Sequence, residues 1–571
     1  MAKVGVVIPL APRGKLLPMQ RNSRSSRILA GAFALPLIGA LLAGCSSTGS
    51  SDSTAQGKEP VTGGTMVYAS GDAEPSCLDP HVGGNYPQAL VASQYLESLF
   101  TKDANGEIIP WLAESTEVSK DGLTRTIKLR EGIKFTDGTK LTANAIKANV
   151  KHLKDPNTAS STGYLAVGKV VSVEAKDELT AVLKLSAPDN ALLESLAMPW
   201  TAIESPKALE RDQATNCAAP VGTGPFKVES WEHQKAVNLV RNDGYVLPVA
   251  DEKRTSSTAY LDGITWRFIP EAATRYAALQ SGEVDVIDNA QPDTIASASD
   301  AGLGHLDAPR PGASNRIELN SSKAPFDDQR VREAFIRAVD ANTGVSALFF
   351  GTAQRSNSLL SSVEPLGYSD ESLFTTDTAK ANQLLDDAGW SERDAQGYRV
   401  KNGKRLSLAF PVSTNQSVPA EQSLFEQFQA QAKAVGFEVK IDLLDLSSWY
   451  GALAKHEYNL VSAPYTKVGP SVLRVLYHSD STVPAPSGYF ANNAQVKNKK
   501  LDQLLNKAEE TEDGAQRASL YEQAQKIVLE GYYVLPLYDQ QNHFLYGKNV
   551  HGVGTTTAVS SPIYFDTFLD Q

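Results

Sequence analysis

Residues able to carry out catalysis are present in this 571-residue chain, but not at the spacings that catalysis requires. None of the eight histidines lies three or four residues from another, so no local pair could bind zinc. His456-Glu457 does not continue as His-Glu-x-x-His, because Leu460 stands where the second histidine would be. The chain also lacks the Gly-x-Ser-x-Gly turn of many hydrolases. We therefore predict that the protein is not an enzyme and holds no metal ion.

The run Gly222-Thr223-Gly224-Pro225 is glycine-rich but does not fit a phosphate-binding loop. It has no Gly-Lys-Ser/Thr ending, and Pro225 cannot contribute a backbone N–H to a helix start. We expect no cofactor. The net charge of -11 also argues against a nucleic-acid partner.

Cys45 is the residue whose setting points most directly to chemistry. It ends Leu42-Ala43-Gly44-Cys45, after an apolar run over residues 28–43 that is shorter than the roughly 20 residues of a membrane span. Arginines precede the run: Arg21, Arg24 and Arg27. This order resembles a bacterial lipobox, so we predict a signal peptide over 1–44 and a lipid on the Cys45 thiol. An ordinary secretory signal with a chance cysteine is the alternative, and Met19 is a plausible true start.

Small polar residues follow Cys45 and predict a flexible tether over 45–60. We expect the protein to be anchored to the membrane, with its body on the extracytoplasmic side, as a monomer. That compartment is oxidising, so the two remaining cysteines, Cys77 and Cys217, predict one disulfide. Two buried free thiols are the alternative.

The hydrophobic patterns predict mixed α/β structure throughout. Thr142, Asp328 and Asp377 each precede a helical pattern and suit N-caps, and Gly389 suits the end of the last of these helices. The expected strands are 64–69, 127–129, 406–410, 437–443 and 533–537, with a hairpin over 171–185, and further helices are expected over 89–100, 425–435 and 515–529.

Several segments, in order, resemble family 5 of the bacterial extracellular solute-binding proteins, which includes oligopeptide, dipeptide and nickel binders. The matching segments are Leu78-Asp79-Pro80-His81, residues 97–141, 220–226, 241–245, 276–287 and 325–332. Each is weak alone, but the ordered set spans nearly all of the mature chain.

The resemblance implies a periplasmic-binding-protein-like α/β fold of class II (cluster C), bilobal with three subdomains and a two-segment hinge formed by crossovers near 314 and 540. Domain I would comprise 61–85, 218–314 and 541–571, domain II 86–217, and domain III 315–540. The partners it implies are a small peptide or peptide-like solute and an ABC permease and ATPase complex. An extracytoplasmic hydrolase or a sensor on the same fold are the remote alternatives.

In peptide-binding relatives, an aspartate near an aromatic residue receives the α-ammonium of the ligand. The matching stretch here keeps Tyr465 but has Thr466 and Lys467 in the region of the aspartate. Lys467, with Arg474 beyond it, would attract a carboxylate instead. A peptide held mainly by its backbone and an anionic metal–chelator complex both remain open. The ligand-binding candidates taken from the resemblance are Asn85, Tyr86, Tyr164, Trp449, Ser462, Ala463, Tyr465, Thr466, Lys467 and Arg474.

Overall fold

The computed structural model describes residues 58–103, 105–249, 256–414, 416–462, 464–556 and 558–570. They belong to one compact unit, Lys58–Gln571. The predicted signal peptide, Met19, Cys45 and Ala463 lie outside the described residues, as does most of the predicted tether. Among the helices that are described, none is long and apolar enough to cross a membrane.

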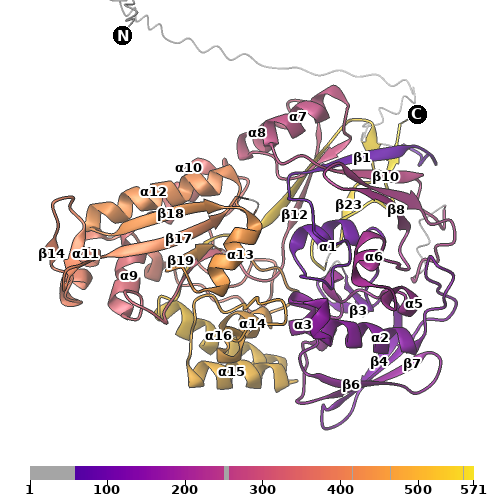
Figure 1. Ribbon diagram of the computed structural model, residues 1–571, viewed down its shortest axis with the longest axis horizontal. Coiled ribbons are helices and arrows are strands. Elements are labelled where there is room, and N and C mark those ends of the chain that lie inside the picture. The colour runs from indigo at the N-terminus through magenta and orange to yellow at the C-terminus, as the bar shows by residue number, and fades with distance from the viewer. Residues whose placement is uncertain are drawn as a thin grey trace, which may run out of the picture. The chain divides into compact units, whose positions relative to one another are not determined.

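A seven-stranded mixed sheet collects strands from distant parts of the chain, in the order β12-β21-β11-β1-β10-β9-β8 (Figure 1). Its strand β1 follows the pattern of a strand covered on both sides. Met66 and Tyr68 pack with α1 (Tyr86–Ala92), while Ala69 packs with α7 (Ala272–Ser281) and α8 (Pro292–Ser297). The strands are β1 (Thr65–Ser70), β8 (Phe226–Glu232), β9 (Ala236–Arg241), β10 (Gly263–Phe268), β11 (Val286–Ile287), β12 (Gly304–Pro309) and β21 (Gln541–Tyr546).

A four-stranded sheet, β4-β5-β7-β6, lies in the segment between β1 and β8. It contains the predicted hairpin, since β6 (Val170–Ala175) and β7 (Thr180–Leu185) pair antiparallel. Apolar residues of α2 (Ala143–Lys154) pack in the same core. The other elements here are β2 (Phe100–Lys102), β3 (Ile108–Pro110), β4 (Ala113–Val118), β5 (Thr124–Leu129), α3 (Thr162–Ala166), α4 (Leu192–Ser195), α5 (Pro206–Leu209) and α6 (Gln213–Ala218).

A third group of elements surrounds the parallel pair β17 (Ser407–Ser413) and β18 (Glu438–Leu444), with α12 (Pro419–Val435) packed on it (Figure 1). Beside it, β13 (Asn315–Leu319) pairs with β19 (Leu460–Ser462) and β20 (Val534–Tyr538). The remaining helices are α9 (Gln329–Ala338), α10 (Ala341–Leu348), α11 (Thr378–Asp387), α13 (Leu446–Ala454), α14 (Val472–Tyr477), α15 (Lys499–Glu510) and α16 (Gly514–Glu530). Short strands complete the fold: β14 (Glu392–Arg393), β15 (Arg399–Lys401), β16 (Lys404–Arg405), β22 (Val550–His551), β23 (Gly554–Thr555), β24 (Pro562–Ile563) and β25 (Phe568–Leu569).

Two neighbouring connections carry the chain between the seven-stranded sheet and the third group. One runs from β12 to β13 and the other from β20 to β21, and the strands on each side are paired antiparallel. These connections fall at the two positions where the hinge was predicted, near 314 and 540. The domain boundaries themselves remain a prediction.

Most of the predicted capping residues do cap helices. The side chains of Asp328 and Asp377 accept hydrogen bonds from the first turns of α9 and α11, and Gly389 has a φ of +82° just beyond α11. Thr142 stands at the N-cap of α2 but makes no side-chain hydrogen bond there.

The helix predicted over 89–100 is wrong in its second half, because α1 ends at Ala92. Beyond that helix, the carbonyls of Gln94 and Tyr95 accept hydrogen bonds from the backbone N–H groups of Phe226 and Gly224. Gly224 permits this approach, since a Cβ there would lie 2.7 Å from the Tyr95 backbone. Pairing with a distant segment therefore overrides the helical pattern.

Cys77 and Cys217 form the predicted disulfide across 140 residues of sequence. Next to it, the backbone N–H of Leu78 donates to the Cys217 carbonyl at 2.9 Å. The bond fastens the segment that follows β1 to the end of α6.

Candidate functional site

Two adjoining cavities of about 540 and 260 Å³ lie between three parts of the structure: the seven-stranded sheet, the segment between β1 and β8, and the third group. The larger cavity has a size typical of sites for small molecules. The two cavities are adjacent, because seven residues line both: Ala73, Tyr86, Pro87, Arg310, Gln416, Leu446 and Pro464. We refer to the two together as the cleft.

Arg310 is a cationic side chain that lines both cavities of the cleft, and it directly follows β12 in the first of the two connections. Its guanidinium lies 3.7 Å from the centre of the Tyr86 ring. Its Nε donates to Thr466 Oγ1 at 3.0 Å. No carboxylate of the described residues pairs with it within 4.0 Å, so it faces the cleft with its charge unneutralised by direct contact.

Four predicted candidates come together in the larger cavity: Asn85, Tyr86, Tyr465 and Thr466. Asn85 caps α1 by accepting from the Gln88 N–H, and its carbonyl accepts from Trp200 Nε1 at 3.0 Å. The Tyr86 hydroxyl donates to the Val559 carbonyl at 3.2 Å. Tyr86 thus presents its ring to the cleft from a position fixed by a contact with a distant segment of the chain.

Five other candidates line neither cavity: Tyr164, Trp449, Ser462, Lys467 and Arg474. Trp449 is buried in a cluster with Leu453 and Phe490, whereas its neighbour Tyr450 faces the cleft. Arg474 donates to Asn506 at 2.9 Å and lies 3.4 Å from Glu509. The ligand-binding roles assigned to these residues remain predictions.

Lys467 is buried at the junction between the segment of α4 and the third group. Its Nζ donates to Ser195 Oγ at 3.2 Å, and its charge acts on Glu194. Gly469 makes room for the Glu194 carboxylate, because a Cβ at that position would lie 2.0 Å from Oε2. Burial, and then repulsion by Glu364, raise the pKa of Glu194 to about 7 against the opposing effect of Lys467.

Asp72 is the acidic counterpart of Arg310 within the cleft. Burial, followed by the negative charge of Asp288, raises the pKa of Asp72 to about 7, while Arg310 opposes the shift. Asp288 is itself held by Tyr68, Ser70 and the Gly71 N–H. The cleft therefore contains a positive and a negative group that are not paired directly with each other.

The sequence analysis missed Arg310, Asp72 and Tyr450. For Arg310 a signal was present, since it stands between Pro309 and Pro311 at the predicted hinge. For Asp72 and Tyr450 the sequence offered no local signal, because their place in the cleft depends on how distant segments pack.

Comparisons with known proteins identify the class to which this fold and cleft belong. The fold is similar to NikA from Brucella suis in complex with Fe(III)-EDTA, with a TM-score of 0.74, 24% identity and coverage of 89% of this chain and all of that one. DppA from Helicobacter pylori, in complex with the peptide STSA, has a TM-score of 0.76 at 22% identity over 90% of this chain and 99% of that one. These likenesses establish a periplasmic-binding-protein fold.

The particular family follows from the sequence comparisons. The family model "Bacterial extracellular solute-binding proteins, family 5 Middle" matches residues 107–486. The glutathione-binding protein GsiB of Shigella dysenteriae serotype 1 is 29% identical over 537 residues, covering 91% of this chain and 95% of GsiB. The chain belongs to family 5 of the bacterial extracellular solute-binding proteins, which serve ABC importers and are not enzymes.

Because of Glu194, the free energy of unfolding of the protein should fall as pH rises. Between about pH 4.5 and 7 the folded state keeps a proton on Glu194 that the unfolded state releases, so the free energy of unfolding falls with increasing pH. Relative to wild type, Glu194→Gln should gain about 2–3 kcal/mol of stability between pH 5 and pH 8. Urea unfolding at four pH values measures this difference, and a constant difference would contradict the assignment.

Proposed function

We propose that this protein is the lipid-anchored binding component of an ABC importer, and that it captures a small peptide-like solute bearing both carboxylate and ammonium groups. The observation that carries the proposal is Arg310, which faces the cleft without a carboxylate partner among the described residues. A ligand carboxylate would form a charge-assisted, bidentate pair with its guanidinium.

Asp72 supports the second half of the proposal. A ligand ammonium would pair with the Asp72 carboxylate. Asp72 would thus take the role of the aspartate that peptide-binding relatives have in the region of Thr466 and Lys467. Glutathione has this combination of groups, and GsiB relatives are named as glutathione-binding proteins. Glutathione, or a short peptide of similar charge, is therefore the preferred ligand class.

An anionic metal–chelator complex is the second candidate, because Arg310 would also bind its carboxylates. The likeness to NikA with bound Fe(III)-EDTA favours it only at the level of fold. Such a ligand need not have an ammonium group, so Asp72 separates the two candidates.

Arg310→Met should weaken the binding of glutathione about 10- to 100-fold, because a charged hydrogen bond contributes about 1.5–3 kcal/mol. Arg474→Met provides the matched comparison, since this arginine lies outside the cleft and should leave affinity within about twofold. Isothermal titration with glutathione, the dipeptide Met-Leu and Fe(III)-EDTA measures both variants. Loss of affinity in Arg474→Met alone would reject the central role of Arg310, and binding of Fe(III)-EDTA alone would favour the metal-chelate candidate.

Affinity for glutathione should fall about tenfold from pH 8 to pH 6. Asp72, with a pKa of about 7, becomes protonated over this range and then no longer attracts an ammonium group, whereas glutathione keeps its own charges. Asp72→Asn should bind more weakly at pH 8 and show no such pH dependence. An equal pH dependence in wild type and variant would place the titrating group elsewhere.

The lipid anchor on Cys45 belongs to the proposal as well, supported by the apolar run before this residue and by its place in Leu-Ala-Gly-Cys. Cys45→Ser should release the protein from membranes and abolish its labelling by an alkynyl fatty acid in a bacterial host. Labelling that persists in the variant would show that the lipid is attached elsewhere.

A further inference from the structure

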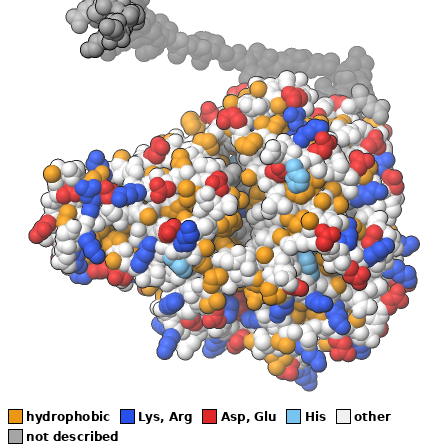
Figure 2. All heavy atoms as spheres, viewed as in Figure 1, with side chains coloured by type: hydrophobic (Ala, Val, Ile, Leu, Met, Phe, Trp, Pro, Cys, Tyr) orange, Lys and Arg blue, Asp and Glu red, His pale blue; other side chains and the backbone are white. Residues whose placement is uncertain are grey.

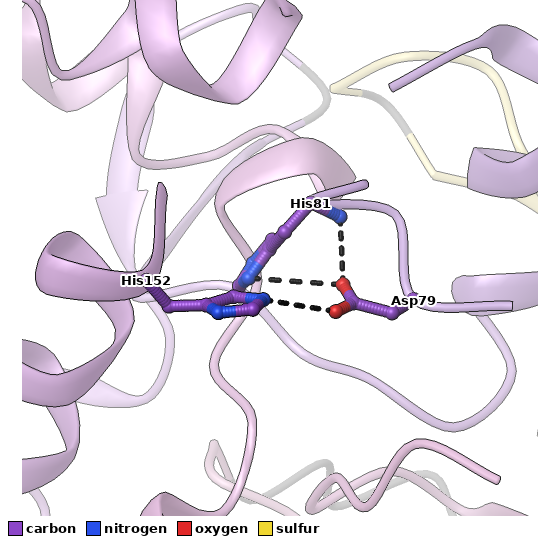
Figure 3. Close-up of side chains that lie close together, drawn as sticks. All are labelled: Asp79, His81 and His152. Carbon is purple, nitrogen blue, oxygen red and sulfur yellow. Dashed lines mark hydrogen bonds and ion pairs between the residues drawn. The ribbon is translucent and has the colours of Figure 1, made fainter. Parts of the chain in front are cut away.

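Asp79, His81 and His152 lie together outside the cleft, although His152 is distant from the others in sequence. Figure 3 shows both histidine rings directed at the carboxylate of Asp79. Asp79 and His81 follow β1, and His152 projects from α2. One donor atom from each residue lies within 4.8 Å of the other two. The side chains of Asp79 and His81 are fully buried, and that of His152 is 19% exposed.

The hydrogen bond made by His81 leaves one ring nitrogen free to bind an ion. Its Nε2 lies 2.9 Å from the Ala202 carbonyl, which can only accept, so Nε2 carries the proton. Nδ1 then has a lone pair, is buried and makes no hydrogen bond within the described part of the chain. It is directed at Asp79 Oδ1, 3.8 Å away. Histidines that bind metals are commonly held in this way, with the other nitrogen donating to a carbonyl.

His152 is oriented similarly by Thr158. The Thr158 hydroxyl donates to the His152 carbonyl at 2.7 Å, so its oxygen can accept from His152 Nδ1, 3.2 Å away. Nε2 of the neutral ring would then have its lone pair toward Asp79 Oδ2 at 3.0 Å. Two lone pairs at this distance repel each other unless a proton or a cation lies between them.

Glu204 adds a second buried carboxylate to the cluster. Asn216 Nδ2 bridges the two acids, at 3.1 Å from Asp79 Oδ2 and 2.9 Å from Glu204 Oε2. Glu204 Oε1 is buried and has no hydrogen-bond partner among the described residues. Two neighbouring carboxylates removed from water are stable only if a cation or a proton lies beside them.

We propose that Asp79, His81 and His152 form a structural site for one divalent transition-metal ion of the zinc class, with the Glu204 carboxylate beside it. Two carboxylates and two neutral imidazoles around a divalent ion give a net charge of zero. Asp79 and the two imidazoles supply three of the four oxygen and nitrogen ligands that tetrahedral zinc sites use. The ion would tie the segment after β1 to α2, close to the Cys77–Cys217 disulfide. None of the four residues lines the cleft, so the site is independent of the solute.

The metal content of the full chain, purified in detergent from cells supplied with zinc, tests the proposal. We expect about one zinc per chain, retained through dialysis against a weak chelator, and a visible absorption spectrum of tetrahedral Co²⁺ after exchange. His152→Gln should lose most of this metal, and Glu204→Gln should retain it less well, because one of the two balancing negative charges is removed. Adding zinc to metal-free wild type should raise its Tm but leave the Tm of His152→Gln unchanged.

The matched control is the pair of substitutions His305→Ala and His543→Ala. With Asp307 these histidines form the other described group of this kind, on the paired strands β12 and β21. His543 also lines the smaller cavity of the cleft, so this control is read by metal content alone. The control should retain the zinc and the cobalt spectrum. Zinc lost from the control but kept by His152→Gln would move the metal to the group on β12 and β21 and overturn the proposal. Metal-free wild type whose Tm does not respond to zinc would also overturn it and indicate that protons balance the buried acids.

Solute binding is read separately, by titration of metal-free and zinc-loaded protein with glutathione. Zinc content that follows the variants supports the metal site whether or not glutathione binds. Conversely, glutathione binding without zinc uptake would leave the proposed function standing and reject the metal site.

Discussion

The antiparallel pairing of β12 with β21, continued by β13 with β20, is the constraint on which the rest of the structure depends. It makes the chain cross twice between the same two groups of elements, side by side. The residues that line the cleft come from the groups on both sides of this double connection. Arg310 lies in the first of the two connections, directly after β12. Any motion of one group relative to the other must bend these connections and would therefore move the positive charge of Arg310.

Buried charge is the second feature that organises the molecule. Arg316 and Glu318 form a fully buried ion pair on β13, and Asp288 is held by three hydrogen-bond donors beneath the cleft. Such groups cost free energy when they are buried, and they are tolerated only where partners are fixed in advance. By contrast, charges of both signs are interspersed over the face seen in Figure 2. On this face, charges of neither sign gather into a single large patch.

Local patterns predicted much of the fold. The hairpin over β6 and β7, the caps at Asp328 and Asp377 and the strands β17, β18 and β20 all depend on residues close in sequence. The order of the family motifs then implied the periplasmic-binding-protein-like fold, which the structure confirms. The helix predicted over 89–100 failed because the partners of Gln94 and Tyr95 come from residues 224–226.

The site was less predictable for the same physical reason. Tyr86 and Thr466 could be found from the resemblance, but their contact through Arg310 joins three distant segments. Lys467 has the charge expected of a ligand-binding residue. Its side chain instead donates a hydrogen bond to Ser195, and its charge acts on Glu194. Likewise, the search for paired histidines found none, because His81 and His152 meet only after α2 packs against the loop that follows β1.

The strand order of the large sheet also determines when it can be completed during synthesis. β21 lies between β11 and β12, yet it is made long after both, from the C-terminal end of the chain. Until residues 541–546 emerge, the facing edges of β11 and β12 carry unpaired backbone groups, and such edges invite pairing with other chains. The gap between β11 and β12 therefore cannot be filled until the C-terminal segment is in place, and a chain cut before residue 541 would keep both edges exposed.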